Sequence, residues 1–216
     1  MKASNWFEAC GIVAWPLLAF SIVGLAMIAE RLLFWFRVNR RQKRVVREVL
    51  KLYQHDPEVA IRKLQQNADL PIARIFLEAL ELNHPSPEKF RIALESAAQA
   101  EIPTLKRFST AFDTIISLSP LLGLLGTVLG LITSFAALNI GDVGGTKTAG
   151  VTAGISEALV STASGLVVAI FTLMFANTFR GFYLRQIALI QEYGGQIELL
   201  YLDRYEQEEV SHASTR

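Results

Sequence analysis

Polar side chains inside apolar stretches are the residues of this chain whose types and positions could do chemistry. Glu157 is the one ionisable residue in the run 151–179. A charged carboxylate near a bilayer centre costs on the order of 2.5 to 3.5 kcal/mol, so such a group faces a cavity or a partner. Because Glu157 lies near the start of the run, capping or hydrating the helix end is the alternative interpretation.

Hydroxyl groups accompany this carboxylate in two neighbouring apolar runs. The hydroxyl candidates for an ion pathway are Thr127, Ser134, Ser161 and Thr162. A row of hydroxyls can hold water or hydrogen-bond a carboxyl group, but it does not titrate near neutral pH. At about 100° per residue, Glu157 and Thr162 lie about 140° apart on one helix. We therefore expect them to mark a lumen and an adjoining interface.

This chain has too few titrating groups in its apolar stretches to carry protons across a membrane. The runs 114–138 and 151–179 contain no second ionisable residue besides Glu157. One carboxylate does not make a relay through a layer about 30 Å thick. If ions cross here, a partner protein has to supply a titrating group.

Three apolar stretches are long enough to position these residues in a membrane, which takes roughly 20 residues per helix. The first runs from about 11 to 36, the second from 114 to 138 and the third from 151 to 179. A cleaved signal peptide is a weaker interpretation of the first, which has only Lys2 before it and is too long. The connecting loop 139–150 holds four glycines, so the second and third stretches form a hairpin.

Small residues recur at helical spacing in both hairpin helices and predict close helix packing rather than chemistry. They are Gly123, Gly126 and Gly130 in the second stretch, and Gly154, Ala158, Gly165 and Ala169 in the third.

Composition supports a membrane protein and excludes several other classes. The 216 residues are 51% hydrophobic, and 21 Lys and Arg against 20 Asp and Glu give a net charge of +1. No global basic field exists to hold nucleic acid. The lone Cys10 and three histidines without metal-ligand spacing predict no disulfide, metal or other cofactor.

Basic residues flank the stretches on one side only, which sets the orientation. Seven Lys and Arg crowd positions 31–47, and Arg180 and Arg185 follow the third stretch, whereas the loop 139–150 has Lys147 against Asp142. We expect an outside N-terminus with a first transmembrane helix (1–36), a cytoplasmic helical segment (37–113), a transmembrane hairpin (114–179) and a cytoplasmic C-terminal helix and tail (180–216).

Cap residues and apolar periodicity predict helices in the cytoplasmic parts. Asp56 before Pro57 and Ser86 before Pro87 have the order typical of helix starts. The spacing after residue 87 predicts a helix that runs on into the second stretch, with a kink at Pro103. The same period continues beyond the third stretch. The fold class expected is therefore all-α integral membrane, with three transmembrane helices and long cytoplasmic extensions.

The sequence SPLLGLLGTVLGLITSF, followed after a short loop by GISEALVSTASGLVVAI, resembles the inner helix pair of the ExbB, TolQ and MotA proton-channel family. The resemblance covers about 119–177 in detail. Three spans favour the ExbB and TolQ branch over the four-span MotA branch.

The resemblance implies a homopentameric ring in a bacterial inner membrane, with the second and third helices lining a central pore. An ExbD-like or TolR-like single-span partner would place a membrane aspartate there, facing Thr127 and Thr162, while Glu157 matches the family's glutamate. The implied function is a proton-channel subunit that converts proton motive force into work, delivered by a TonB-like or TolA-like protein.

Other functions remain open at this point. The chain could serve outer-membrane transport with TonB or envelope maintenance as TolQ does, and it could be a scaffold that conducts nothing. A solute carrier is disfavoured because no internal repeat with broken helices is evident. An enzyme is disfavoured because Glu157 has no His, Asp or Lys companion in the hairpin.

Overall fold

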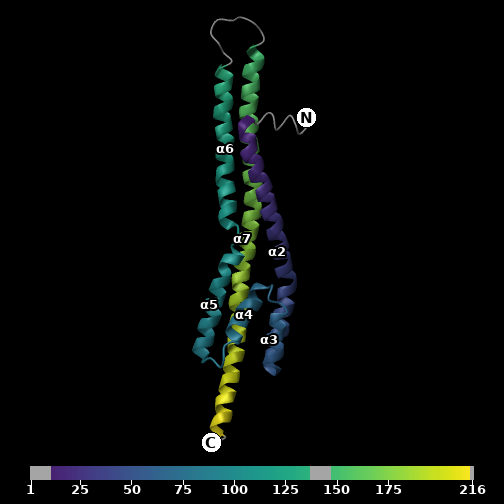
Figure 1. The fold of residues 1–216 in the computed structure, drawn as a ribbon, viewed down its shortest axis with the longest axis vertical. Coiled ribbons are helices and arrows are strands. Elements are labelled where there is room, and N and C mark those ends of the chain that lie inside the picture. Colours follow the sequence, from purple (N-terminus) through teal and green to yellow (C-terminus); the bar gives the residue numbers. More distant parts are fainter. Residues whose placement is uncertain (1–10, 137–146, 215–216) are drawn as a thin grey trace. The chain divides into compact units, whose positions relative to one another are not determined.

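The computed structural model describes residues 11–136 and 147–214, and all elements in these ranges are helices (Figure 1). They are η1 (Gly11–Val13), α2 (Ala14–His55), α3 (Pro57–Gln65), α4 (Pro71–Leu80), α5 (Pro87–Leu105), α6 (Ser109–Ala136) and α7 (Lys147–Ser214). The predicted loop lies outside the described residues up to position 146, and α7 begins at Lys147.

Three of these helical segments are long and apolar enough to cross a membrane. They lie within Gly11–His55, Pro87–Ala136 and Gly150–Val210. The first and third contain the predicted stretches 11–36 and 151–179, and the second contains the predicted stretch 114–138 up to Ala136, where the described residues end. The prediction of an all-α integral membrane protein with three spans is confirmed.

The chain divides into two compact units. The first contains residues 1–31 and 108–179, and the second contains 32–107 and 180–216. Helix α6 belongs to the first unit and helices α3 to α5 belong to the second, while α2 and α7 contribute to both. The first unit therefore holds the candidate ion-pathway residues.

Local signals in the second unit act as the sequence predicts. The Asp56 side chain accepts a hydrogen bond from the Val59 amide and caps α3, and the Ser86 hydroxyl accepts one from the Lys89 amide and caps α5. The apolar face of α5 packs on α7. The rings of Phe90 on α5 and Tyr201 on α7 stack there with centroids 4.1 Å apart. The extension of α7 beyond the third span is confirmed.

The predicted continuous helix from residue 87 into the second span is wrong. Helix α5 ends at Leu105, and α6 starts only at Ser109. Between them Phe108 has a φ of 67°, a left-handed conformation that a right-handed helix cannot contain. Pro103, which lacks an amide proton, already removes a hydrogen bond from the last turn of α5. Residues 106–108 form a turn that separates the two helices.

Candidate ion-pathway site

The carbonyl oxygen of Gly123 is the point where the hydroxyl residues of α6 and α7 meet. The Thr162 hydroxyl donates to it across the helix pair at 3.1 Å, and the Ser161 hydroxyl lies 3.4 Å from it. A methyl group at position 123 would lie 3.0 Å from the Thr162 α-carbon. The absence of a side chain at Gly123 thus lets α7 approach the α6 backbone.

Thr127 lies one helical turn from Gly123 on α6, so it is adjacent to the point where Thr162 contacts that helix. Its hydroxyl donates to the Leu124 carbonyl within its own helix. The side chain is partly exposed in the single chain. Thr127 and Thr162 therefore occupy one region of the α6–α7 pair.

Ser134 and Ser161 lie inside the pair and have little exposed surface. Ser161 is fully buried, and its hydroxyl also donates to the Ala158 carbonyl at 2.9 Å. The Ser134 hydroxyl contacts the Gly130 carbonyl at 2.9 Å and the Val151 carbonyl at 3.2 Å. Both hydroxyls are thus held on backbone oxygens between the helices.

The glycines among the small residues lie at close contacts between α6 and α7. A methyl group at Gly130 would lie 2.7 Å from the Gly154 carbonyl oxygen and 2.9 Å from the Ala158 amide nitrogen. Added methyl groups at Gly126 and Gly165 would overlap Ser161 and the Ser119 carbonyl oxygen, respectively. Ala158 and Ala169 are buried on the same face of α7. Any larger side chain on this face would separate the helices.

Glu157 lies on another side of α7, against the start of the described chain. A methyl group at Gly11 would overlap its carboxylate oxygen, and Gly11 has a φ of 58°, which favours glycine. The carboxylate is half-buried. Thr162 therefore contacts α6 one helical turn from Thr127, whereas Glu157 lies beside η1.

Arg31 is a buried cation whose position the sequence does not reveal. The sequence places it among the basic residues that flank the first span, yet only 2% of it is exposed. Its guanidinium lies 3.2 Å from Glu30 and 5.5 Å from the centroid of the Phe108 ring, a cation–π arrangement. The adjacent Glu30 and Arg31 at the end of an apolar run are the only signal that could have suggested this.

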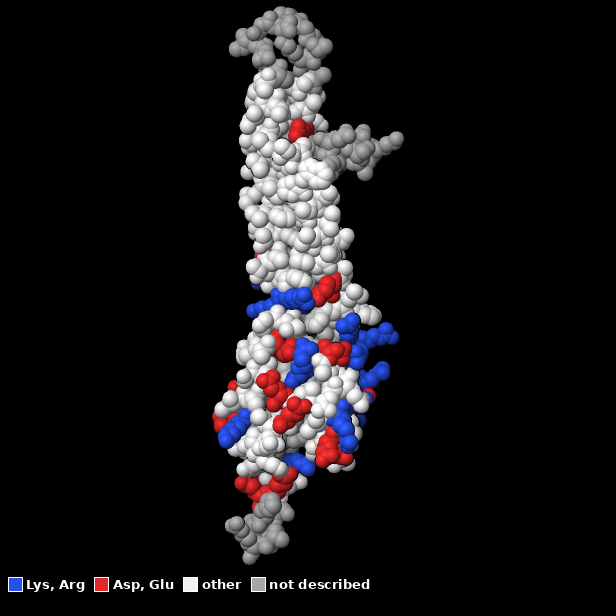
Figure 2. All heavy atoms as spheres, viewed as in Figure 1, with Lys and Arg blue, Asp and Glu red and all other residues white. Residues whose placement is uncertain are grey.

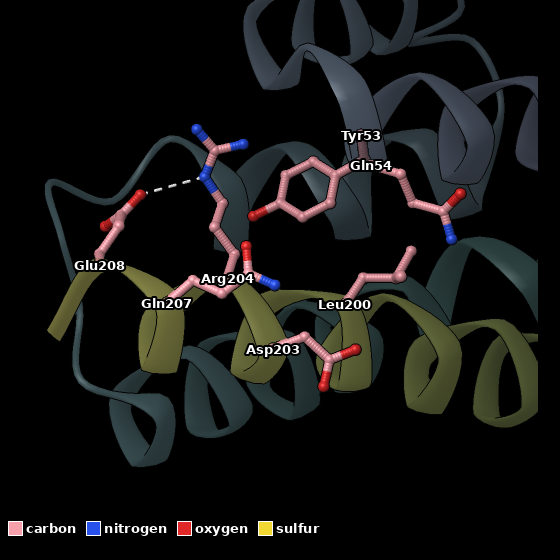
Figure 3. Close-up of a pocket in the computed structure, with 7 residues that line it drawn as sticks. All are labelled: Tyr53, Gln54, Leu200, Asp203, Arg204, Gln207 and Glu208. Atoms are coloured by element: carbon pink, nitrogen blue, oxygen red, sulfur yellow. Dashed lines mark hydrogen bonds and ion pairs between the residues drawn. The ribbon is translucent and has the colours of Figure 1, made fainter. Parts of the chain in front are cut away.

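A cavity of about 530 Å³ in the second unit lies outside this site (Figure 3). It lies between the ends of α2 and α7, and Arg204 pairs with Glu208 at 3.1 Å on its edge. Burial raises the pKa of Tyr53, which lines the cavity, to about 12. Nothing in this lining resembles a catalytic arrangement.

The candidate site thus consists of two closely packed apolar helices, each within a segment long enough to span a membrane, with hydroxyls held on backbone carbonyls. Comparison with known sequences gives the family. Residues 67–192 match the MotA/TolQ/ExbB proton channel family. The chain belongs to this family.

Similar proteins include ExbB-like and TolQ relatives. The chain is 60% identical over 209 residues to the biopolymer transport protein named ExbB-like 3 of Synechocystis sp., covering 96% of this chain and 100% of that protein. It is 32% identical to the biopolymer transport protein ExbB of Neisseria meningitidis, over 71% of this chain and 74% of that protein. It is 38% identical to the Tol-Pal system protein TolQ of Haemophilus influenzae, over 49% of this chain and 44% of TolQ.

Proposed function

We propose that this chain is the channel subunit of a motor in a bacterial inner membrane that couples proton motive force to mechanical work. In this proposal five copies form a ring whose α6 and α7 helices line the pore. An ExbD-like single-span partner enters the pore with a membrane aspartate, and a TonB-like protein carries the work to outer-membrane transport. The N-terminus lies outside, and the second unit lies in the cytoplasm.

The arrangement of Thr127 and Thr162 carries this proposal. Both hydroxyls donate their protons to backbone carbonyls, Thr127 to Leu124 and Thr162 to Gly123. Their oxygens therefore remain as acceptors. A protonated carboxyl group has an O–H to donate, whereas a carboxylate only accepts. The threonine pair thus favours the protonated form of a visiting acid over its charged form.

This preference gives each chain a defined task in proton transfer. The partner's acid enters the threonine region neutral and loses its proton only when it leaves for a wetter or oppositely charged region. Moving one charge through 100 mV releases about 2.3 kcal/mol, so several protons can drive substantial displacement of the partner. The small residues of α6 and α7 keep the helix pair intact while the partner moves.

The remaining candidate residues take supporting roles in this proposal. We assign Ser134 and Ser161 to holding α6 against α7, because both are buried and bonded to carbonyls. We assign Glu157 to the interface with η1, because Gly11 lies directly on its carboxylate. The pathway through one chain is thus centred on Thr127 and Thr162.

A TolQ-like role in envelope maintenance is the second candidate function. It is favoured by the 38% identity with the TolQ of Haemophilus influenzae over 109 residues. The broader coverage of ExbB relatives favours the TonB-linked role. A non-conducting scaffold is the third alternative, and flux measurements separate it from both.

Photo-cross-linking to the partner tests the proposed pore. A photoreactive residue at position 127 should cross-link to the single-span partner, whereas one at Leu125 should not. Leu125 is 47% exposed but lies about 160° away around α6, so it is a matched control. Equal cross-linking from both positions, or cross-linking from Leu125 alone, would contradict the proposed orientation of α6.

A further inference from the structure

The exposed side chains on one face of α2 are apolar up to Phe36 and basic beyond it. Leu25, Leu32, Leu33 and Phe36 are 44% to 67% exposed on this face. Counted at 100° per residue, all four lie within about 60° of Phe36. An exposed apolar face on a membrane helix is the face that lipid chains cover.

The basic residues that follow lie on the same face. Arg40, Lys43, Arg44, Arg47 and Lys51 all fall within about 80° of Phe36 around the helix. They line a groove of about 400 Å³ and are exposed. Figure 2 shows Lys and Arg gathered on the side of the second unit that α2 forms. The lipid-facing side of α2 thus continues as a cationic surface, which we call the α2 basic face.

These cations are available to an external anion. Within the described residues, no carboxylate forms an ion pair with Arg40, Lys43 or Arg44. Arg41, which points away from this face, is by contrast paired with Asp69 at 2.7 Å. The fold neutralises the arginine on the inner side and leaves those on the α2 basic face without acidic partners.

The position of Arg40 favours a membrane surface as the occupant. Its guanidinium lies 5.8 Å from the centroid of the Phe36 ring, so the side chain extends back by one turn toward the apolar part of the helix. Phe36 is 64% exposed and ends the apolar face. Arg40 therefore lies at the level where the hydrocarbon ends and phosphate groups begin.

Distance along the helix limits how many cations can reach this surface. At 1.5 Å per residue, Arg40, Lys43 and Arg44 lie about 6 to 12 Å beyond Phe36, and Lys51 lies about 22 Å beyond it. The headgroup layer is roughly 5 to 8 Å thick, and charges act over a further Debye length of about 8 to 10 Å. The first three residues fall inside this range and Lys51 falls outside it.

We propose that the α2 basic face binds anionic phospholipid headgroups of the leaflet at which α2 leaves the membrane, through Arg40, Lys43 and Arg44. Basic clusters directly beside a membrane helix attract anionic lipid in this way. The binding would hold acidic lipids around the assembly. It requires only that the chain spans the membrane and does not depend on the proposed proton pathway.

Lipid selectivity of the full-length protein tests this proposal. The protein is reconstituted in phosphatidylcholine, and the association constants of spin-labelled phosphatidylglycerol and phosphatidylcholine are compared by electron paramagnetic resonance. A cation near the surface contributes roughly a fivefold preference. The variant carrying R40Q, K43Q and R44Q should therefore lose at least fivefold of the phosphatidylglycerol preference of the wild type.

A matched variant removes the same charge farther from the membrane. R62Q, K89Q and R91Q together also remove three exposed positive charges, all outside the α2 basic face, and this variant should keep the wild-type preference. An unchanged preference in the first variant, or an equal loss in both, would overturn the proposal. A changed oligomer mass with unchanged lipid preference would also overturn it, because the face would then contact a second copy.

Salt dependence of the wild type keeps the test decisive if the first variant does not fold. At 1 M NaCl the Debye length falls to about 3 Å, and headgroup attraction to exposed cations is largely screened. The preference for phosphatidylglycerol should disappear at this concentration. A preference that survives 1 M NaCl would contradict an electrostatic α2 basic face.

Discussion

Replacing Gly130 by alanine tests how tightly α6 and α7 are packed. The new methyl group would lie 2.7 Å from the Gly154 carbonyl oxygen and 2.9 Å from the Ala158 amide nitrogen. Both atoms belong to the backbone of α7 and cannot rotate away, so the helices have to separate. Overpacking of this kind costs about 1 to 3 kcal/mol.

Gly195, on the part of α7 that belongs to the second unit, is the matched control. No atom lies within 4 Å of a methyl group placed there. Glycine inside a helix is about 0.5 to 1 kcal/mol less favourable than alanine, so Gly195→Ala should be neutral or stabilising. The gain in helix propensity is common to both substitutions, so they should differ by the overpacking cost alone, about 1 to 3 kcal/mol in unfolding free energy.

The assay is reversible unfolding of the purified chain in mixed micelles by titration with a denaturing detergent, followed by circular dichroism. Gly130→Ala should lower the unfolding free energy, and Gly195→Ala should leave it unchanged or raise it. Equal values for the two variants would refute the close contact at Gly130. A larger loss in Gly195→Ala would contradict the packing account altogether.

Three further predictions follow from contacts described above. The amides of Gln42 and Gln186 bond each other in a buried pair at 2.8 and 3.1 Å, so Gln42→Leu should cost about 1 to 3 kcal/mol in the same titration, and adding Gln186→Leu should recover most of it. A double variant no more stable than the single one would contradict this. Because the pKa of Tyr53 is about 12 in the folded chain against about 10 when unfolded, the unfolded state loses its proton first, and stability should fall as pH rises from 10 to 12. Tyr53→Phe should show a smaller fall, and an identical pH profile would argue against the burial of this hydroxyl. Thr127→Val combined with Thr162→Val should reduce partner-dependent proton flux by at least tenfold, while the corresponding serine variants, which keep the hydroxyls, should retain most of it.

Much of the fold follows from local signals in the sequence. Asp56 and Ser86 cap their helices through short-range hydrogen bonds that depend on a few adjacent residues. The three spans follow from the length of uncharged apolar sequence alone. Such features can be predicted because the deciding interactions lie within one or two helical turns.

Other features depend on contacts between distant residues and could not be predicted. The turn at Phe108 requires a left-handed backbone that neither the apolar period nor Pro103 indicates. The contact of Gly11 with Glu157 and the burial of Arg31 under the Phe108 ring join segments about 80 to 150 residues apart in the sequence. Angular spacing predicts that Glu157 and Thr162 lie on different sides of one helix, but it does not predict which residues contact either of them.

Proton flux in liposomes under an imposed membrane potential, reported by an internal pH dye, tests most directly whether conduction requires the partner's aspartate. The chain alone should conduct no more than protein-free liposomes, because its pore hydroxyls do not titrate. Adding the ExbD-like partner should raise the flux, and the same partner with its membrane aspartate changed to asparagine should not. Rapid flux through the chain alone, or through the asparagine complex, would contradict the claim that the partner's aspartate carries the protons through a pore formed by this chain.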